Sequence, residues 1–95
     1  MKPGQVYMTD ALSWYQNDVV ELTKIFKDQG NWGNIPKVKL FEKNGRYYLI
    51  DGNHRVKAAR NASLSYLEYD LLSESDVKRY YPNYNTDNIE ASAVE

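Results

Sequence analysis

Apolar positions recur along this chain with two different periods, which separate helical from extended segments. Between residues 17 and 30, apolar side chains return every three or four positions, and this spacing predicts an amphipathic helix. The apolar stripe consists of Val19, Leu22, Ile25 and Phe26. We expect Asn17 to cap this helix and Gly30 to end it.

Two alternating runs, residues 37–43 and 46–51, lie on either side of the pair Asn44-Gly45. Asn-Gly between alternating runs is a strong short-range indication of a β-hairpin. Pairing outward from this turn sets Val38 opposite Asp51. Because both faces of the hairpin carry large apolar side chains, we expect the sheet to be covered, at least in part, on both sides.

The pattern becomes helical after Gly52, and residues 66–71 alternate again as a third strand. A last helix is expected between Ser73, which opens a sequence resembling a capping box, and Pro82. These elements predict an α/β (α+β) fold with a mixed sheet, a β-hairpin and packed helices. The predicted regions are an N-terminal arm (1–16), the folded domain (17–82) and a polar C-terminal tail (83–95) that is disordered at its extreme end.

Composition narrows the functional classes. The chain has no cysteine, which excludes disulfides, zinc–thiolate sites and thiol catalysis, and we expect neither zinc nor haem. Twelve Lys and Arg residues against thirteen Asp and Glu residues give a net charge of −1, so any positive patch for nucleic acid must be local. No run approaches the ~20 apolar residues of a membrane span, and no signal peptide is recognisable. We therefore expect no membrane partner and a cytoplasmic location.

The junction Asp51-Gly52-Asn53-His54-Arg55 carries the candidate chemistry. A strand that ends in glycine and turns directly into a helix leaves the first helical N–H groups without partners in that helix, and the helix dipole makes them attractive to anions. Glycine permits close backbone approach. The next side chains add donors, and the planar guanidinium suits phosphate oxygens. This chemistry fits a phosphate or the phosphate chain of a nucleotide.

A purely structural interpretation of the same residues stays open at this point. Asp-Gly is a common turn pair, and Asp51 could cap the helix that follows. Arg55 could form a structural ion pair with Asp51 or Glu68.

The stretch "GRYYLIDGNHRVKAARNA", residues 45–62, resembles the signature of the ParB/sulfiredoxin superfamily, in which a strand leads into Gly-x-x-Arg-x-x-Ala-Ala and a short helix. The matching residues are Gly52, Arg55, Ala58 and Ala59. The order of the upstream elements is similar too, so the resemblance covers roughly residues 17–72. It implies an α/β fold with nucleotide phosphates at the helix start. The implied site residues are Gly52, Asn53, His54 and Arg55 around the phosphates, and Pro36 and Lys37 beside the nucleotide.

Departures from the family pattern limit what the resemblance implies. Sulfiredoxins carry a catalytic cysteine at the position of Asn53, so reduction of sulfinic acids is excluded. Partitioning proteins carry a downstream helix-turn-helix domain, for which residues 73–95 are too short. Free-serine kinases are similar in the motif but much longer. A nuclease would need a metal cluster, and Asp51, Glu68 and Asp70 are more simply interpreted as solvated carboxylates on strands.

Two functions remain. The first is binding of phosphate or a nucleotide (ATP, ADP or CTP), with or without hydrolysis or phosphoryl transfer. In this hypothesis Asp51 is the base or the Mg²⁺ ligand, His54 donates to phosphate or transfers a proton, and Arg55 neutralises charge.

The second function is a non-catalytic binding or regulatory module that engages a protein or nucleic-acid partner. Trp14, Tyr15 and Trp32 would be its interface anchors if they are exposed, and core residues if they are not. The basic residues of the hairpin would contact a phosphate backbone, or would merely protect a strand edge. They are Lys37, Lys39, Lys43 and Arg46.

Overall fold

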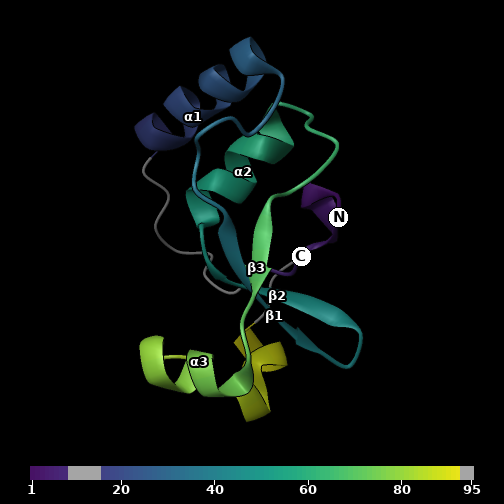
Figure 1. Cartoon of the computed structure of the whole chain (residues 1–95), viewed down its shortest axis with the longest axis vertical. Helices are drawn as coiled ribbons and strands as arrows, with labels where there is room; N and C mark the ends of the chain where they lie inside the picture. The colour runs from purple at the N-terminus through teal and green to yellow at the C-terminus, as the bar shows by residue number, and fades with distance from the viewer. Residues whose placement is uncertain (9–15, 93–95) are drawn as a thin grey trace.

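Helices and short strands alternate along the chain, of which the computed structural model describes residues 1–8 and 16–92. The elements in chain order are the 3-10 helix η1 (Pro3–Gln5), α1 (Gln16–Gln29), β1 (Val38–Lys43), β2 (Arg46–Asp51), α2 (Asn53–Asn61), β3 (Tyr69–Leu71), α3 (Glu74–Tyr80) and the 3-10 helix η2 (Thr86–Ser92). The sheet lies between α1 and α2 on one side and α3 and η2 on the other (Figure 1). The strand order is β2-β1-β3, with β2 antiparallel and β3 parallel to β1. This mixed sheet confirms the predicted α+β class.

Buried side chains form two cores, one on each face of the sheet. The first core consists of Val6, Met8, Phe26, Trp32, Val38, Leu40, Leu49, Val56, Ala58, Ala59 and Leu67. The second core consists of Tyr48, Ile50, Val77 and Ile89. Successive residues of β2 alternate between the two cores, as the pleat of a strand requires. The prediction of a sheet covered on both sides is therefore confirmed.

The hairpin has the turn that Asn44-Gly45 predicted, because both residues have positive φ (53° and 77°), as a type I′ turn requires. Farther from the turn the predicted register is wrong. The register shifts between Lys39 and Leu40, so that Lys39 rather than Val38 lies opposite Asp51. A bulge re-aims the side chains beyond it. Here it sets a lysine beside an aspartate where β2 ends.

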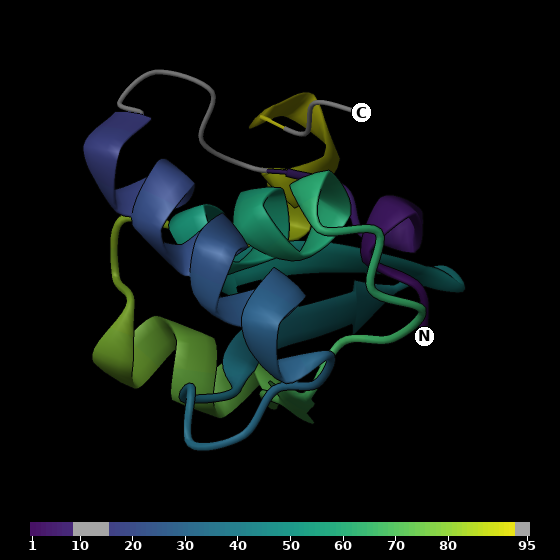
Figure 2. The same ribbon diagram turned by 90° about the horizontal axis from the view of Figure 1, so that it is seen from above.

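Of the predicted stripe of the first helix, Val19 and Phe26 are buried and Leu22 is half-buried, whereas Ile25 is 36% exposed. The helix begins at Gln16, so Asn17 lies inside its first turn and not at the cap position that we expected. It ends at Gly30 as expected, with φ of 74° and a 2.8 Å hydrogen bond from the Gly30 N–H to the Phe26 carbonyl. Figure 2 shows α1 running beside α2 over the same face of the sheet. Within residues 1–8 and 16–92, no helix has the length and apolar character needed to span a membrane.

Residues 1–8, which we expected to belong to an extended arm, form part of the folded domain. The Tyr7 N–H donates to the Tyr47 carbonyl at 2.9 Å, and the Tyr7 carbonyl accepts from the Leu49 N–H at 2.9 Å. Val6 and Met8 are buried in the first core. This segment is therefore attached to the edge of β2 by two hydrogen bonds and to the first core by two buried side chains. The pairing is long-range, so the local periodicity of the sequence does not reveal it.

Residues 83–92, which we expected to be a polar tail, pack on the second core through the fully buried Ile89. The Lys43 ammonium lies 2.8 Å from the Glu90 carboxylate, and the Thr86 hydroxyl donates to Glu74 at 2.9 Å. The expected disorder concerned the extreme end, and residues 93–95 lie outside the described part of the chain.

Acid should weaken this attachment of the C-terminal segment. Hydrogen bonds hold the pKa of Glu90 (chiefly from Lys43) and the pKa of Glu74 (chiefly from Thr86) below the ordinary value of 4.5. A carboxylate with a depressed folded-state pKa stabilises the fold above its unfolded-state pKa, and that stability is lost as the pH falls through the folded-state value. The thermal midpoint, followed by circular dichroism, should therefore fall from roughly pH 5 to pH 3. Glu90→Gln should show a shallower fall, and an unchanged pH dependence in this variant would contradict the assignment.

Candidate functional site

The turn between β2 and α2 has the geometry that the motif predicted. Asp51 ends β2, Asn53 begins α2, and Gly52 between them has φ of 115° and ψ of 31° in the left-handed region. The N-cap residue of α2 is Gly52, which has no side chain to form a capping bond, so the alternative in which Asp51 caps this helix is wrong. The first hydrogen bond of the helix runs from the Val56 N–H to the Gly52 carbonyl at 3.0 Å. The backbone N–H groups of residues 53–55 come before it and lie at the positive end of the helix dipole.

Gly52 is required by packing as well as by its backbone conformation. A Cβ atom at this position would lie 2.5 Å from Val38 Cγ1 and 2.9 Å from Val38 Cβ. Non-bonded contacts this short are essentially never made by Cβ atoms in folded proteins. The turn therefore lies directly against β1, and the fully buried Val38 fills the space that a side chain at position 52 would need.

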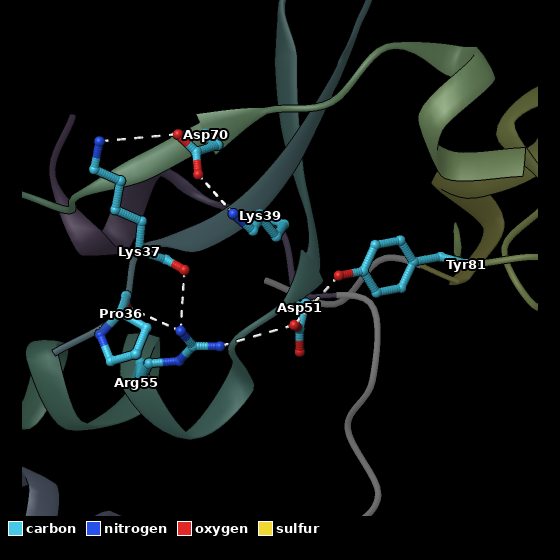
Figure 3. A network of polar contacts seen from close by, with 7 residues as sticks. All are labelled: Pro36, Lys37, Lys39, Asp51, Arg55, Asp70 and Tyr81. Carbon is cyan, nitrogen blue, oxygen red and sulfur yellow. Dashed lines mark hydrogen bonds and ion pairs between the residues drawn. The ribbon is translucent and has the colours of Figure 1, made fainter. Parts of the chain in front are cut away.

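Arg55 joins α2 to the segment that leads into β1. Its Nη1 donates to the carbonyl oxygens of Pro36 at 2.9 Å and Lys37 at 3.0 Å, and its Nη2 lies 3.9 Å from Asp51 Oδ2 (Figure 3). Its side chain is only 20% exposed. The structure thus brings Arg55, Pro36 and Lys37 together. It also contains the structural ion pair that the sequence left open, with Asp51 as the partner.

Two side chains approach the Asp51 carboxylate, one from α2 and one from the residue after α3. The Tyr81 hydroxyl, just after α3, lies 3.4 Å from Asp51 Oδ2, and Arg55 approaches the same oxygen from α2 (Figure 3). Burial raises the pKa of Tyr81, and the neighbouring Asp51 charge raises it further. The hydroxyl therefore stays protonated and can donate to the carboxylate. No feature of the sequence pointed to Tyr81, because only the packing of α3 against the sheet brings it to the turn.

A second set of charges continues from the turn across the sheet. Lys39 lies opposite Asp51 in β2 and beside Asp70 in β3. Its ammonium is 2.6 Å from Asp70 Oδ2, while the Lys37 ammonium is 3.9 Å from Asp70 Oδ1 (Figure 3). The hydrogen bond from Lys39 lowers the pKa of Asp70, so this carboxylate remains charged at neutral pH. In the register of the sheet, Lys39 on β1 therefore lies between Asp51 on β2 and Asp70 on β3.

The carboxylates do not gather into a metal centre. Within residues 1–8 and 16–92, no group of three or more His, Asp or Glu side chains could hold a metal ion. Asp51 faces Arg55 and Tyr81, whereas Asp70 faces two lysines. Asp51 is therefore a single carboxylate for Mg²⁺, and the other ligands of such an ion would be phosphate oxygens and water.

His54 and Asn53 occupy the first turn of α2. His54 is half-buried and lines a groove of about 420 Å³ between α1 and the turn. The other lining residues are Asp18, Glu21, Leu22, Ile25, Ile35, Pro36 and Arg55. The Oδ1 atom of Asn53 is buried and has no hydrogen-bond partner among the described residues. An unpaired buried polar atom is costly, so this oxygen marks a place where an external donor would be stabilised.

Apart from Lys37 and Lys39, the residues of the second hypothesis do not lie at the turn. Trp32 is fully buried and packs edge-on against Phe26, with ring centroids 5.0 Å apart, so its expected role as an exposed anchor is wrong. Trp14 and Tyr15 lie outside the described residues. Among the basic residues of the hairpin, Lys43 pairs with Glu90, and the Arg46 guanidinium lies over the Tyr7 ring at 5.5 Å. Internal partners therefore engage these side chains.

No protein-family model and no curated protein matches this chain. Its function must therefore be argued from the site itself, and the superfamily resemblance stays a prediction.

Proposed function

We propose that this chain is a ParB/sulfiredoxin-like domain that binds a nucleotide or phosphate at the turn between β2 and α2. The observation that carries the proposal is the start of α2, whose N-cap residue is the left-handed Gly52 and therefore supplies no capping side chain. An anion is a suitable partner for N–H groups in this position because the helix dipole adds positive potential there. The orphaned Asn53 Oδ1 beside them is an acceptor, so its partner would be a water or a donor group of the ligand and not a phosphate oxygen.

Two cations have different tasks in this proposal. Arg55 positions the loop, since its Nη1 is occupied by the carbonyls of Pro36 and Lys37, and its positive charge balances the Asp51 carboxylate. Lys37 is 56% exposed, and its ion pair with Asp70 is long at 3.9 Å. A long, exposed ion pair contributes little to stability, so the Lys37 ammonium is available to a phosphate.

The catalytic part of the proposal concerns Asp51 and His54. Asp51 would bind Mg²⁺ that arrives with a nucleotide, or accept a proton, and Tyr81 would hold its carboxylate in place. His54 would donate to a phosphate oxygen or transfer a proton. Phosphoryl transfer and hydrolysis depend mainly on positioning and charge stabilisation, which such a small set of groups can supply. The alternative of a partner-binding module loses support because the anchor Trp32 is buried.

Thermal unfolding of the unaltered protein tests the proposal. The probes are inorganic phosphate, ATP, ADP and CTP, each with and without Mg²⁺. A ligand at ~100 times its Kd adds about 2.7 kcal/mol of stability. In a domain of this size each kcal/mol raises the midpoint by roughly 4–8 °C. We expect a shift of this order with at least one probe.

A variant with an added negative charge identifies the site of binding. His54→Glu places a carboxylate in the first turn of α2, where it repels an incoming anion. The matched control is Lys57→Gln, which changes the charge by the same amount at an exposed position of α2. Binding should fall at least tenfold in the first variant only. The proposal fails if no probe raises the midpoint, or if His54→Glu binds as tightly as the control.

A further inference from the structure

Two grooves run along opposite sides of α1, which lies at one end of the molecule with α2 between it and the sheet (Figure 1). The first is the groove of about 420 Å³ that borders the turn. The second has a volume of about 320 Å³ and borders Asn61, where α2 ends. Both grooves are open to solvent, so each side of α1 offers a surface to another molecule.

The α1 residues of the two grooves form two stripes with the same spacing and opposite charge. The acidic stripe, in the first groove, consists of Asp18, Glu21, Leu22 and Ile25. The basic stripe, in the second groove, consists of Val20, Thr23, Lys24 and Lys27. The second set repeats the spacing of the first two residues later, which places it about 200° further around the helix axis.

Both stripes expose apolar and charged side chains together. Val20 is 64% exposed and Ile25 is 36% exposed. The four charged side chains of the stripes are also exposed, and none of them has a hydrogen bond or an ion pair within residues 1–8 and 16–92. Exposed apolar groups beside unpaired charges of one sign suit a surface of the opposite charge.

The two stripes complement each other when two α1 helices lie antiparallel. Read from its C-terminal end, the basic stripe has the spacing of the acidic stripe read from its N-terminal end. The residues that then lie opposite each other are Asp18 and Lys27, Glu21 and Lys24, Leu22 and Thr23, and Ile25 and Val20. A parallel alignment would instead set the apolar Leu22 and Ile25 opposite lysines. Charge and apolar character therefore match in one direction only.

We infer that the groove beside the turn binds a second copy of this chain through the basic stripe of that copy. The two stripes lie on opposite sides of α1, so each copy keeps one stripe free and the contact is head-to-tail. An antiparallel two-fold contact between the outer faces of two α1 helices would place like-charged stripes side by side, which is repulsive. The inference is independent of the proposed function, because it requires no ligand.

Sedimentation equilibrium of the unaltered protein in a phosphate-free buffer of low ionic strength tests the inference. A contact made by so few residues is weak, so protein concentrations on the order of 1 mM are needed. We expect the average mass to rise with concentration past that of two copies, because head-to-tail contacts continue from copy to copy. Added salt should reverse the rise, since the charged pairs are exposed.

Charge reversals identify the contact. Glu21→Lys and Lys24→Glu should each weaken self-association about tenfold, because each sets like charges opposite each other at the groove. A protein that carries both changes should return to within about twofold of the unaltered protein, since the swapped charges attract again. The matched controls are Asp87→Lys and Arg79→Glu, which make the same charge changes at exposed positions on the other side of the sheet.

Three results would overturn the inference. A mass of one chain at every concentration would show that a second copy does not occupy the groove. A plateau at two copies would show a closed contact in place of a head-to-tail one. A double variant as weak as the single variants would show that positions 21 and 24 do not meet. Circular dichroism of dilute samples should show the same fold in all variants, because the altered side chains are exposed.

Discussion

Gly52→Ala should be among the most destabilising single substitutions in this chain. We expect it to lower the free energy of unfolding by about 2–5 kcal/mol, the sum of left-handed backbone strain and of overpacking. The physical reason is specific, since the added Cβ would meet Val38 Cγ1 at 2.5 Å while φ at this position is 115°. Urea denaturation monitored by circular dichroism measures the loss, and each kcal/mol should lower the thermal midpoint by roughly 4–8 °C.

Gly45→Ala is the matched control, because this glycine also has positive φ (77°) but no atom lies within 4 Å of its added Cβ. It should cost about 1 kcal/mol. The double variant Gly52→Ala/Val38→Ala should be less destabilised than the sum of the two single changes, because removal of the Val38 methyl groups relieves the closest contact. Equal losses in the two glycine variants would show that the turn does not pack against β1 as described.

Trp32→Ala should cost about 3–5 kcal/mol, the range for truncation of a large buried aromatic side chain. Trp32 is fully buried in the first core, and its indole Nε1 donates to the Tyr66 carbonyl at 3.0 Å. Alanine removes the contact with Phe26 and leaves that carbonyl without its donor. Equilibrium denaturation measures the difference, and Trp32→Phe should lose less because it retains an aromatic ring.

Val20→Ala is the corresponding surface control. Val20 lies on α1 and is 64% exposed, so its truncation should change the free energy of unfolding by less than about 0.5 kcal/mol. A Trp32→Ala protein as stable as Val20→Ala would place the indole on the surface and would restore the possibility that it anchors a partner.

The candidate site was only partly predictable. The motif residues Gly52 to Arg55 lie together because they are neighbours in the chain, and the strand-to-helix change of period was visible around them. Tyr81 was not predicted because it follows α3, a helix on the other side of the sheet. The pairing of Asp51 with Lys39 was missed because it depends on a bulge that alternation alone does not show. The engagement of Arg55 by two carbonyls needs the tertiary position of Pro36 and Lys37.

Local residue chemistry by itself determined the hairpin, the end of α1, the glycine junction and the start of α3. In each of these places a few consecutive residues carry the physical cause, as when the Ser73 hydroxyl accepts the Asp76 N–H at 3.1 Å. Only the tertiary structure decided that residues 1–8 attach to β2, that residues 83–92 cover the second core, and that Lys39 lies between Asp51 and Asp70 in the sheet. These features join segments far apart in the chain, and their stability comes from burial and pairing that no local pattern encodes.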